Sequence, residues 1–344
     1  MSPKPSLLLL RPAGNKPSAL EQFHGAELAA RSPALRGCIV LHEDMFVAGN
    51  LTDLEKKVQS LAGKISGVVA ATDVPASTHL GEVADNMGIL CFVANNNPAV
   101  WQHRRHVFHI GVPTNQTSKA VAECLYHHVG ARRVLIIYDD REFQRRVATA
   151  AISALTAIGG EVTTIPGNHK DWLNKVATFH ADLVYLAYSE DARALPYVRG
   201  LRRKLPLLPI LVGRSLLHKD FVSTLGKDSE NLLAVDMFDR SGGGSKKANF
   251  FLATLARAGV AVPTANHGFG WDGMLLCGTT LVKTAGDVTR AIAALESGEL
   301  YCGATGRFAF SSLDHNGRSQ DNPTLLSKFN CGRWEIIGKP SNAG

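Results

Sequence analysis

Long apolar segments are missing from this 344-residue sequence, and charged residues make up only 19% of it. No apolar run approaches the roughly 18 residues that a membrane-spanning helix needs. The N-terminal segment, MSPKPSLLLLRPAG, lacks the apolar core of about 7–15 residues and the small-residue cleavage site that mark an export signal. We therefore expect no membrane insertion, and the sequence as it stands carries no export signal.

Clustered cysteines are also absent. The six cysteines form no CxxC pair and show no Cys/His spacing typical of a metal site. Four of them fall in apolar runs, where cysteine usually serves as a small buried side chain. These four are Cys38, Cys91, Cys124 and Cys277. Free thiols in this number favour a reducing compartment, which bears on the location of the protein.

Catalytic motifs are equally scarce, since the sequence has neither GxSxG nor HExxH. The segment GFGWDG at 268–273 matches GxGxxG, but it follows a Pro-containing loop rather than a strand, which removes the dinucleotide-binding geometry. His103, His106 and His109 recur at every third residue, yet they lead into a β-rich run that would splay alternate side chains apart. We expect no enzyme activity, no cofactor and no metal.

The sequence is rich in apolar residues, at 45%, which indicates a well-packed globular protein of about two domains. The net charge is +7, but Lys and Arg are scattered rather than massed on one element beside aromatic residues. That distribution argues against a nucleic-acid partner.

Short β-branched apolar runs alternate with amphipathic stretches of helical length. Such alternation predicts an α/β fold with two doubly wound parallel sheets, one in each of two lobes. The first series has predicted strands at 6–10, 37–41, 67–71, 90–94 and 107–110, with helices at 20–31, 51–62 and 76–87. The second series has strands at 133–138, 161–165, 183–187, 209–212 and 232–237, with helices at 119–129, 142–158, 171–180 and 192–203. Helices at 248–258, 270–284 and 288–295 and late antiparallel strands at 305–310, 325–329 and 334–337 complete the prediction.

Nine segments, in this order, resemble the type I periplasmic binding proteins, and most of all the branched-chain amino acid and amide-binding (HAAT-type) families that serve ABC importers. They are GVVAATDVPAST (67–78), GILCFVANNNP (88–98), IGVPTNQ (110–116), RRVLIIYDDREFQRR (132–146), AIGGEV (157–162), ADLVYLAY (181–188), LPILVGR (208–214), WDGMLLCG (271–278) and ATGRFAFSSLDHNG (304–317). The resemblance implies a ligand-binding lobe 1 of 1–112 plus 240–314 and a lobe 2 of 113–239 plus 315–344. Three chain crossings would form a hinge on which the lobes close over a ligand.

Ligands of doubly wound sheets bind beyond the carboxyl ends of the strands. In lobe 1 the resemblance implies a ligand carboxylate or amide held by Thr72, Ser77, Ala94 and Asn96. Thr72 and Asp73 could instead only cap a helix, and the Asn run could only make turns.

The corresponding loops of lobe 2 supply aromatic side chains that would line an apolar ligand body and an arginine that could pair with a carboxylate. The candidates are Tyr138, Phe143, Tyr188 and Arg214. Tyr138 and Tyr188 could also be ordinary core residues that end strands.

One departure from the resembling family concerns the ligand's charge. Amino-acid binders have acids at the positions of Pro113 and Ser215, and those acids pair with the ligand ammonium. An ammonium buried without a partner is costly, so a carboxylate or amide ranks above an amino acid unless Asp139, Glu190 or Asp191 substitutes.

The resemblance implies a solute-binding protein that delivers a small organic ligand to an ABC transporter permease, which implies a periplasmic location. A cytoplasmic ligand sensor of the same fold is the alternative, because the sequence shows no export signal. An authentic start further upstream, encoding a signal peptide, would separate the two.

Overall fold

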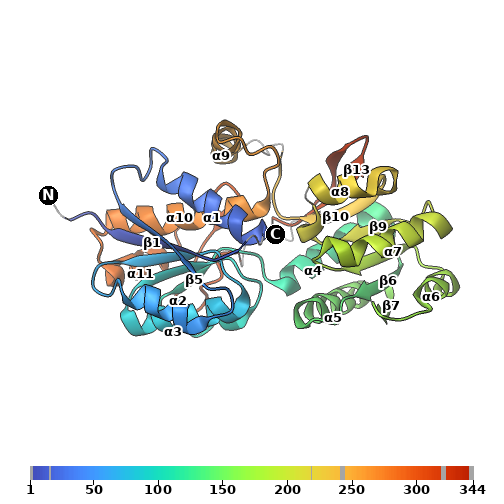
Figure 1. Ribbon diagram of the computed structural model, residues 1–344, viewed down its shortest axis with the longest axis horizontal. Helices are drawn as coiled ribbons and strands as arrows, with labels where there is room; N and C mark the ends of the chain where they lie inside the picture. Colours follow the sequence, from blue (N-terminus) through green and yellow to red (C-terminus); the bar gives the residue numbers. More distant parts are fainter. Residues whose placement is uncertain (1–2, 15–16, 218, 241–244, 319–322, 341–344) are drawn as a thin grey trace. The chain divides into compact units, whose positions relative to one another are not determined.

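The computed structural model of the chain describes residues 3–14, 17–217, 219–240, 245–318 and 323–340 (Figure 1). The chain divides into two compact units, Met1–Pro113 with Arg240–Pro323 and Thr114–Asp239 with Thr324–Gly344. We call these units lobe 1 and lobe 2. The chain therefore passes between them three times. Nowhere in the described residues is there a helix with the length and apolar character needed to cross a membrane.

Lobe 1 contains a five-stranded parallel sheet in the order β2-β1-β3-β4-β5. Its strands are β1 (Ser6–Pro12), β2 (Val40–Phe46), β3 (Gly67–Ala70), β4 (Leu90–Val93) and β5 (Val107–His109). Its helices are α1 (Pro17–Ala30), α2 (Leu51–Gln59), α3 (Val74–Met87), α9 (Lys246–Arg257), α10 (Ala265–Lys283) and α11 (Val288–Leu295), with a short 3-10 turn η1 (Pro98–Val100). The central strands β3 and β4 are buried along their whole length, as a parallel sheet covered on both faces requires.

Helices cover the two faces of this sheet in two groups (Figure 1). On one face, alternate residues of β1, β3 and β4 pack with apolar side chains of α2 and α3. The other face is covered by α1 and α10, which pack closely on each other. The helix predicted from 270 begins at Ala265 instead, so GFGWDG lies wholly inside α10 and is not a loop that could hold a phosphate.

Residues 315–318 belong to lobe 1, whereas the sequence-based division placed them in lobe 2. They are held there by a β-bridge between His109 and Asn316 and by the fully buried Arg318, which donates to the carbonyl of Thr305 at 2.9 Å. The small hairpin of β11 (Tyr301–Cys302) and β12 (Arg307–Phe308), just before this segment, also belongs to lobe 1. The bridge joins residues that are 207 positions apart, which a local pattern does not reveal.

Lobe 2 contains a seven-stranded sheet in the order β14-β13-β10-β9-β8-β6-β7, in which β13 pairs antiparallel with both β10 and β14 and the other neighbours are parallel. Its strands are β6 (Arg133–Tyr138), β7 (Glu161–Pro166), β8 (Leu183–Ala187), β9 (Ile210–Val212), β10 (Leu232–Asp236), β13 (Leu325–Asn330) and β14 (Arg333–Gly338). Its helices are α4 (Thr114–Cys124), α5 (Glu142–Ala157), α6 (Trp172–Phe179), α7 (Asp191–Lys204) and α8 (Lys219–Leu225), with the short turns η2 (Leu125–Val129), η3 (Arg214–Leu216) and η4 (Gly226–Ser229). One face of the sheet packs with α6, α7 and α8, and the other packs with α4 and α5.

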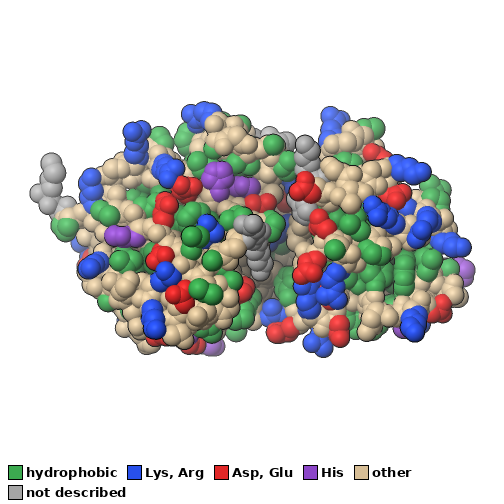
Figure 2. Space-filling model, in the orientation of Figure 1, with side chains coloured by type: hydrophobic (Ala, Val, Ile, Leu, Met, Phe, Trp, Pro, Cys, Tyr) green, Lys and Arg blue, Asp and Glu red, His purple; other side chains and the backbone are tan. Residues whose placement is uncertain are grey.

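Charged side chains are spread over the visible face of each lobe, and many Lys and Arg side chains lie beside Asp or Glu (Figure 2). Ion pairs such as Arg104 with Glu82 (3.1 Å) and Lys57 with Asp44 (3.1 Å) account for part of this mixing. The excess positive charge therefore does not collect into one basic stripe on that face.

Candidate ligand-binding loops

The loop after β3 turns directly into helix α3. Asp73 caps the helix, because its carboxylate accepts the backbone N–H of Ala76 at 3.1 Å. Thr72 is half-buried, and its hydroxyl shares a hydrogen bond with the fully buried hydroxyl of Ser77 in the first turn of α3. The side chain of Asp73 is thus occupied by capping, while Thr72 stays at the surface of the loop.

The loop after β4 lies next to it, because β3 and β4 are neighbours in the sheet. Asn95 is buried there and donates through Nδ2 to Ser77 Oγ at 2.5 Å and to the carbonyl of Thr72 at 3.5 Å. Asn97 caps the 3-10 turn η1 by accepting the N–H of Ala99 at 3.2 Å. The four lobe 1 residues predicted from sequence therefore lie in the two neighbouring loops and the first turn of α3; they are Thr72, Ser77, Ala94 and Asn96.

Asn95 was not among those predicted residues, although its amide holds the two loops together. An Asn-Asn-Asn run gives no sign of which member turns inward. That choice depends on the neighbouring loop, where the hydroxyl of Ser77 supplies the partner.

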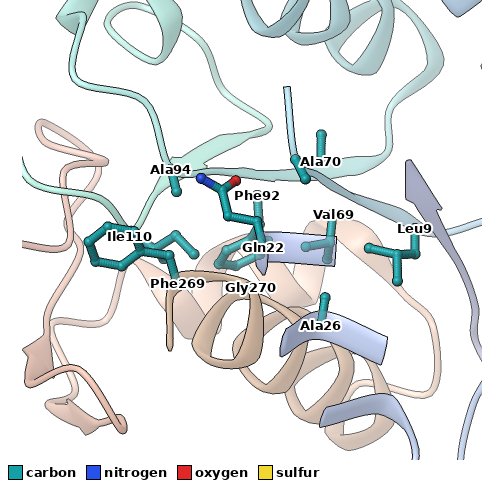
Figure 3. A pocket seen from close by; sticks show the side chains of 11 residues that line it. Leu9, Gln22, Ala26, Val69, Ala70, Phe92, Ala94, Ile110, Phe269 and Gly270 are labelled. Carbon is teal, nitrogen blue, oxygen red and sulfur yellow. The ribbon is translucent and has the colours of Figure 1, made fainter. Parts of the chain in front are cut away.

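A water-sized cavity of about 10 Å³ lies beneath these loops, inside lobe 1 (Figure 3). Its walls are apolar and come from the ends of the central strands and from α1 and α10. The carboxamide of Gln22, on α1, is the polar group at this cavity and lies next to Ala94 (Figure 3). Sequence reasoning missed Gln22, because only the packing of α1 brings it beside the loop after β4.

In lobe 2 the predicted residues also follow strands. Tyr138 ends β6 and is half-buried, and Phe143 lies half-buried in the first turn of α5. Arg214 begins η3 after β9, and one of its guanidinium nitrogens lies 3.8 Å from the sulfur of Met237. These three side chains remain partly accessible at the carboxyl edge of the lobe 2 sheet.

Tyr188 is enclosed to a greater degree. It is 4% exposed, and its ring packs against Tyr197 with centroids 5.2 Å apart. A Cβ at Gly167 would lie 1.7 Å from the Tyr188 hydroxyl, so the absence of a side chain there makes room for this group. Burial and the hydrogen bond with Tyr197 raise the pKa of the Tyr188 hydroxyl. Tyr188 thus lies among the core side chains of lobe 2 in this conformation.

Two acids that could pair with a ligand ammonium are already paired within lobe 2. The Asp139 carboxylate is buried, and its Oδ2 receives Arg141 at 2.6 Å and Arg193 at 2.9 Å. Glu190 pairs with the same Arg141. Because two guanidinium groups neutralise these acids, neither Asp139 nor Glu190 stands ready for a positively charged ligand group.

The three histidines of HRRHVFH lie in three different environments. His103 lies in a turn with φ of 62°, His106 bonds Asp85 through Nδ1 at 2.9 Å, and His109 is fully buried at the end of β5. Among the described residues, no group of three or more His, Cys, Asp or Glu side chains is arranged to hold a metal ion.

Solved structures with the same fold are numerous and distant in sequence. A leucine-binding protein LivK from Thermotoga maritima superposes with a TM-score of 0.82 at 15% identity, over 98% of both chains. LivJ from Streptococcus pneumoniae in complex with isoleucine gives 0.82 at 16% identity, over 98% of this chain and 100% of that one. A solute-binding protein of an ABC transporter from R. palustris in complex with benzoate gives 0.78 at 17% identity, over 98% and 97%. These likenesses establish the two-lobed α/β fold.

No curated protein sequence matches this chain. The sequence does match a protein family over residues 52–321, which is most of its length, and that family is described as periplasmic binding protein. This match shows that the chain is a binding protein rather than an enzyme, and that it belongs to the periplasmic binding protein family.

Proposed function

We propose that this chain is the solute-binding component of an ABC importer, and that it closes its two lobes on a small carboxylate or amide. The observation that carries the proposal is the family match over residues 52–321. The ligand complexes of structural relatives, with leucine, isoleucine and benzoate, support a ligand of this size. A permease as partner and a periplasmic location follow from the same family and form part of the proposal.

The proposed ligand set has a polar half and an apolar half. In lobe 1, hydroxyl, amide and backbone groups of the two adjoining loops would hold the head group. In lobe 2, aromatic rings would line the ligand body and an arginine would meet a carboxylate. The proposed residues are Thr72, Ser77, Ala94, Asn96, Tyr138, Phe143, Tyr188 and Arg214.

The preference for an acid or amide over an amino acid is supported by the charges of lobe 2. Pro113 and Ser215 supply no carboxylate, and the nearby acids Asp139 and Glu190 are paired with arginines. A ligand ammonium that paired with Asp139 or Glu190 would have to displace an arginine, which costs binding energy.

A matched set of ligands tests the proposal. Leucine, isocaproate and isocaproamide share one carbon skeleton and differ in charge, and benzoate and benzamide form a second pair. A ligand present at 100 times its dissociation constant should add about 2.7 kcal/mol to the free energy of unfolding. We expect the acid or the amide to raise the melting temperature more than leucine does. A clear preference for leucine would contradict the proposed charge preference, and no response to any small acid, amide or amino acid would contradict the proposed function.

The proposed head-group residue Asn96 can be tested by calorimetry with the best ligand from that set. Asn96→Ala should weaken binding by about 1–3 kcal/mol, because a buried polar group of the ligand would lose its partner. Asn97→Ser is the matched control, since serine can still cap η1. Equal affinities for wild type and Asn96→Ala would place the head group elsewhere.

The arginine of lobe 2 is tested by comparing acid and amide ligands. Arg214→Ala should weaken isocaproate more than isocaproamide, because only a carboxylate accepts a charged, two-pronged hydrogen bond from guanidinium. An equal loss of affinity for both ligands would show that Arg214 does not bind the carboxylate.

A further inference from the structure

A buried imidazole lies directly beneath the proposed ligand loop of lobe 1. His109 is the last residue of β5 and has no exposed surface. Its Nε2 hydrogen-bonds the backbone carbonyl of Asn95, which lies in the middle of the loop after β4. A carbonyl can only accept a hydrogen bond, so Nε2 carries a proton.

The plane of this ring is fixed from two sides. The Trp101 ring stacks on it with centroids 3.7 Å apart and planes 9° apart. The other ring nitrogen, Nδ1, lies 3.0 Å from the side-chain oxygen of Asn316, which also accepts the backbone N–H of Arg318 at 3.2 Å. His109 therefore has one position and one orientation, as a group that orients another residue must have.

Space for this contact depends on a glycine. A Cβ at Gly111 would lie 2.9 Å from His109 Nε2 and 3.1 Å from the carbonyl carbon of Ala94. Any larger residue would have to push the ring and the loop apart. The close approach of β5, the imidazole and the loop is thus built into the backbone of lobe 1.

The position of Asn95 is passed on to both ligand loops. Its side chain donates to Ser77 Oγ and to the carbonyl of Thr72, while its own carbonyl is held by His109. Displacing the Asn95 backbone would therefore move the loop after β4 and break the link to the loop after β3.

We propose that His109 is a positioning residue for ligand binding: its Nε2–H holds the Asn95 carbonyl and so sets the geometry of the loops after β3 and β4. His109 is enclosed and acts through Asn95 without touching the ligand. The inference rests on the proposed function for its role in binding, but the positioning itself can be measured without any ligand.

Two substitutions separate the hydrogen bond from the packing. His109→Phe keeps an aromatic ring against Trp101 but has no donor, whereas His109→Gln places an N–H donor at about the reach of Nε2. Hydrogen exchange followed by mass spectrometry is measured on the ligand-free chain, for peptides that cover 94–101 and, as a reference, 183–187 of lobe 2. We expect faster exchange at 94–101 in His109→Phe, exchange close to wild type in His109→Gln, and no change at 183–187.

Equal exchange in wild type and His109→Phe at 94–101, or equal loosening in both variants, would overturn the inference. Should His109→Phe fail to fold, ¹⁵N imidazole shifts of the wild-type chain decide instead. A proton on Nε2 supports the inference, with or without a second proton on Nδ1, and a proton on Nδ1 alone contradicts it.

Calorimetry with benzoate and isocaproamide adds the functional readout. His109→Phe should bind the probe that wild type binds about ten-fold more weakly, the equivalent of one hydrogen bond, and His109→Gln should recover most of that loss. Failure of wild type to bind either probe would count against the proposed ligand class and leave the exchange result to decide on His109.

Discussion

The packing of α1 on α10 makes a sharp prediction, because the two helices touch backbone to backbone at two reciprocal glycines. A Cβ at Gly25 would lie 1.9 Å from the His267 carbonyl oxygen, and a Cβ at Gly270 would lie 1.8 Å from the Gln22 carbonyl oxygen. Further backbone atoms would stand within 3.0 Å of either added methyl group. Neither neighbour can move aside by changing a rotamer, so the helices themselves would have to separate.

The expected cost follows from these distances. Ordinary carbon–oxygen contacts need more than about 3 Å, so Gly25→Ala must part the helices by more than about 1 Å and loosen the core on this face of the sheet. Overpacking of this kind costs about 1–3 kcal/mol or more, against a gain of about 1 kcal/mol from the higher helix propensity of alanine. Because the added methyl group would meet backbone atoms, we take the upper end of that cost, about 3 kcal/mol, and expect a net loss of about 2 kcal/mol in the free energy of unfolding for Gly25→Ala and for Gly270→Ala.

Urea unfolding followed by tryptophan fluorescence measures this loss, since Trp271 lies buried in α10 beside the contact. Gly278→Ala is the matched control in the same helix, because its Cβ would meet only the side chain of Leu35, which can shift. Should Gly25→Ala and Gly270→Ala prove as stable as Gly278→Ala, the close helix packing would be refuted, and with it the reason why Gln22 lies beside Ala94.

Three further predictions concern pH, lobe 2 and ligand-induced closure. Burial lowers the pKa of His109 and of His267 to about 4, so between pH 6.5 and 4 the unfolded chain takes up protons that the folded chain refuses. Stability should therefore fall as the pH drops through this window, by about 3 kcal/mol for His109 alone. The urea midpoints at pH 7 and pH 5 should differ less in His109→Gln than in wild type, and a wild-type midpoint that does not change with pH would contradict this prediction. Arg202 donates to four backbone carbonyls between residues 206 and 230, at 2.8–3.3 Å. Arg202→Met should destabilise lobe 2 by about 2 kcal/mol in urea unfolding, whereas the exposed Arg203→Met should have little effect. Saturating ligand should reduce the radius of gyration in solution scattering, and an unchanged curve with a proven ligand would argue against closure.

The amino-acid sequence by itself determined the fold class and most elements. Strands 133–138 and 183–187 were predicted to the residue, because their apolar β-branched runs end at charged or polar neighbours. The parallel sheets and the two-lobed, non-enzymatic binding protein were likewise confirmed. Alternation of buried strands with amphipathic helices is a local signal, and it survives whatever the tertiary contacts are.

Tertiary packing decided where local preference was weak or misleading. Helix α10 begins at Ala265, five residues before the predicted start, although Gly268 and Gly270 are poor helix formers. Gly270 is what the close approach to α1 requires, and the packing outweighs its low propensity. Tertiary contacts also place the segment 315–318 in lobe 1, because its β-bridge partner His109 lies far away in the sequence.

The candidate site divides along the same line. The rule that ligands bind at the carboxyl ends of strands pointed to the loops that hold Thr72 and Asn96, because that rule needs only the order of strands. The resemblance to the periplasmic binding proteins then selected these two residues within the loops. Asn95, His109 and the neutralised Asp139 could not be found in this way. Their roles depend on which buried donor meets which acceptor across distances of 14 to more than 50 residues in the chain, and only the folded structure brings those groups together.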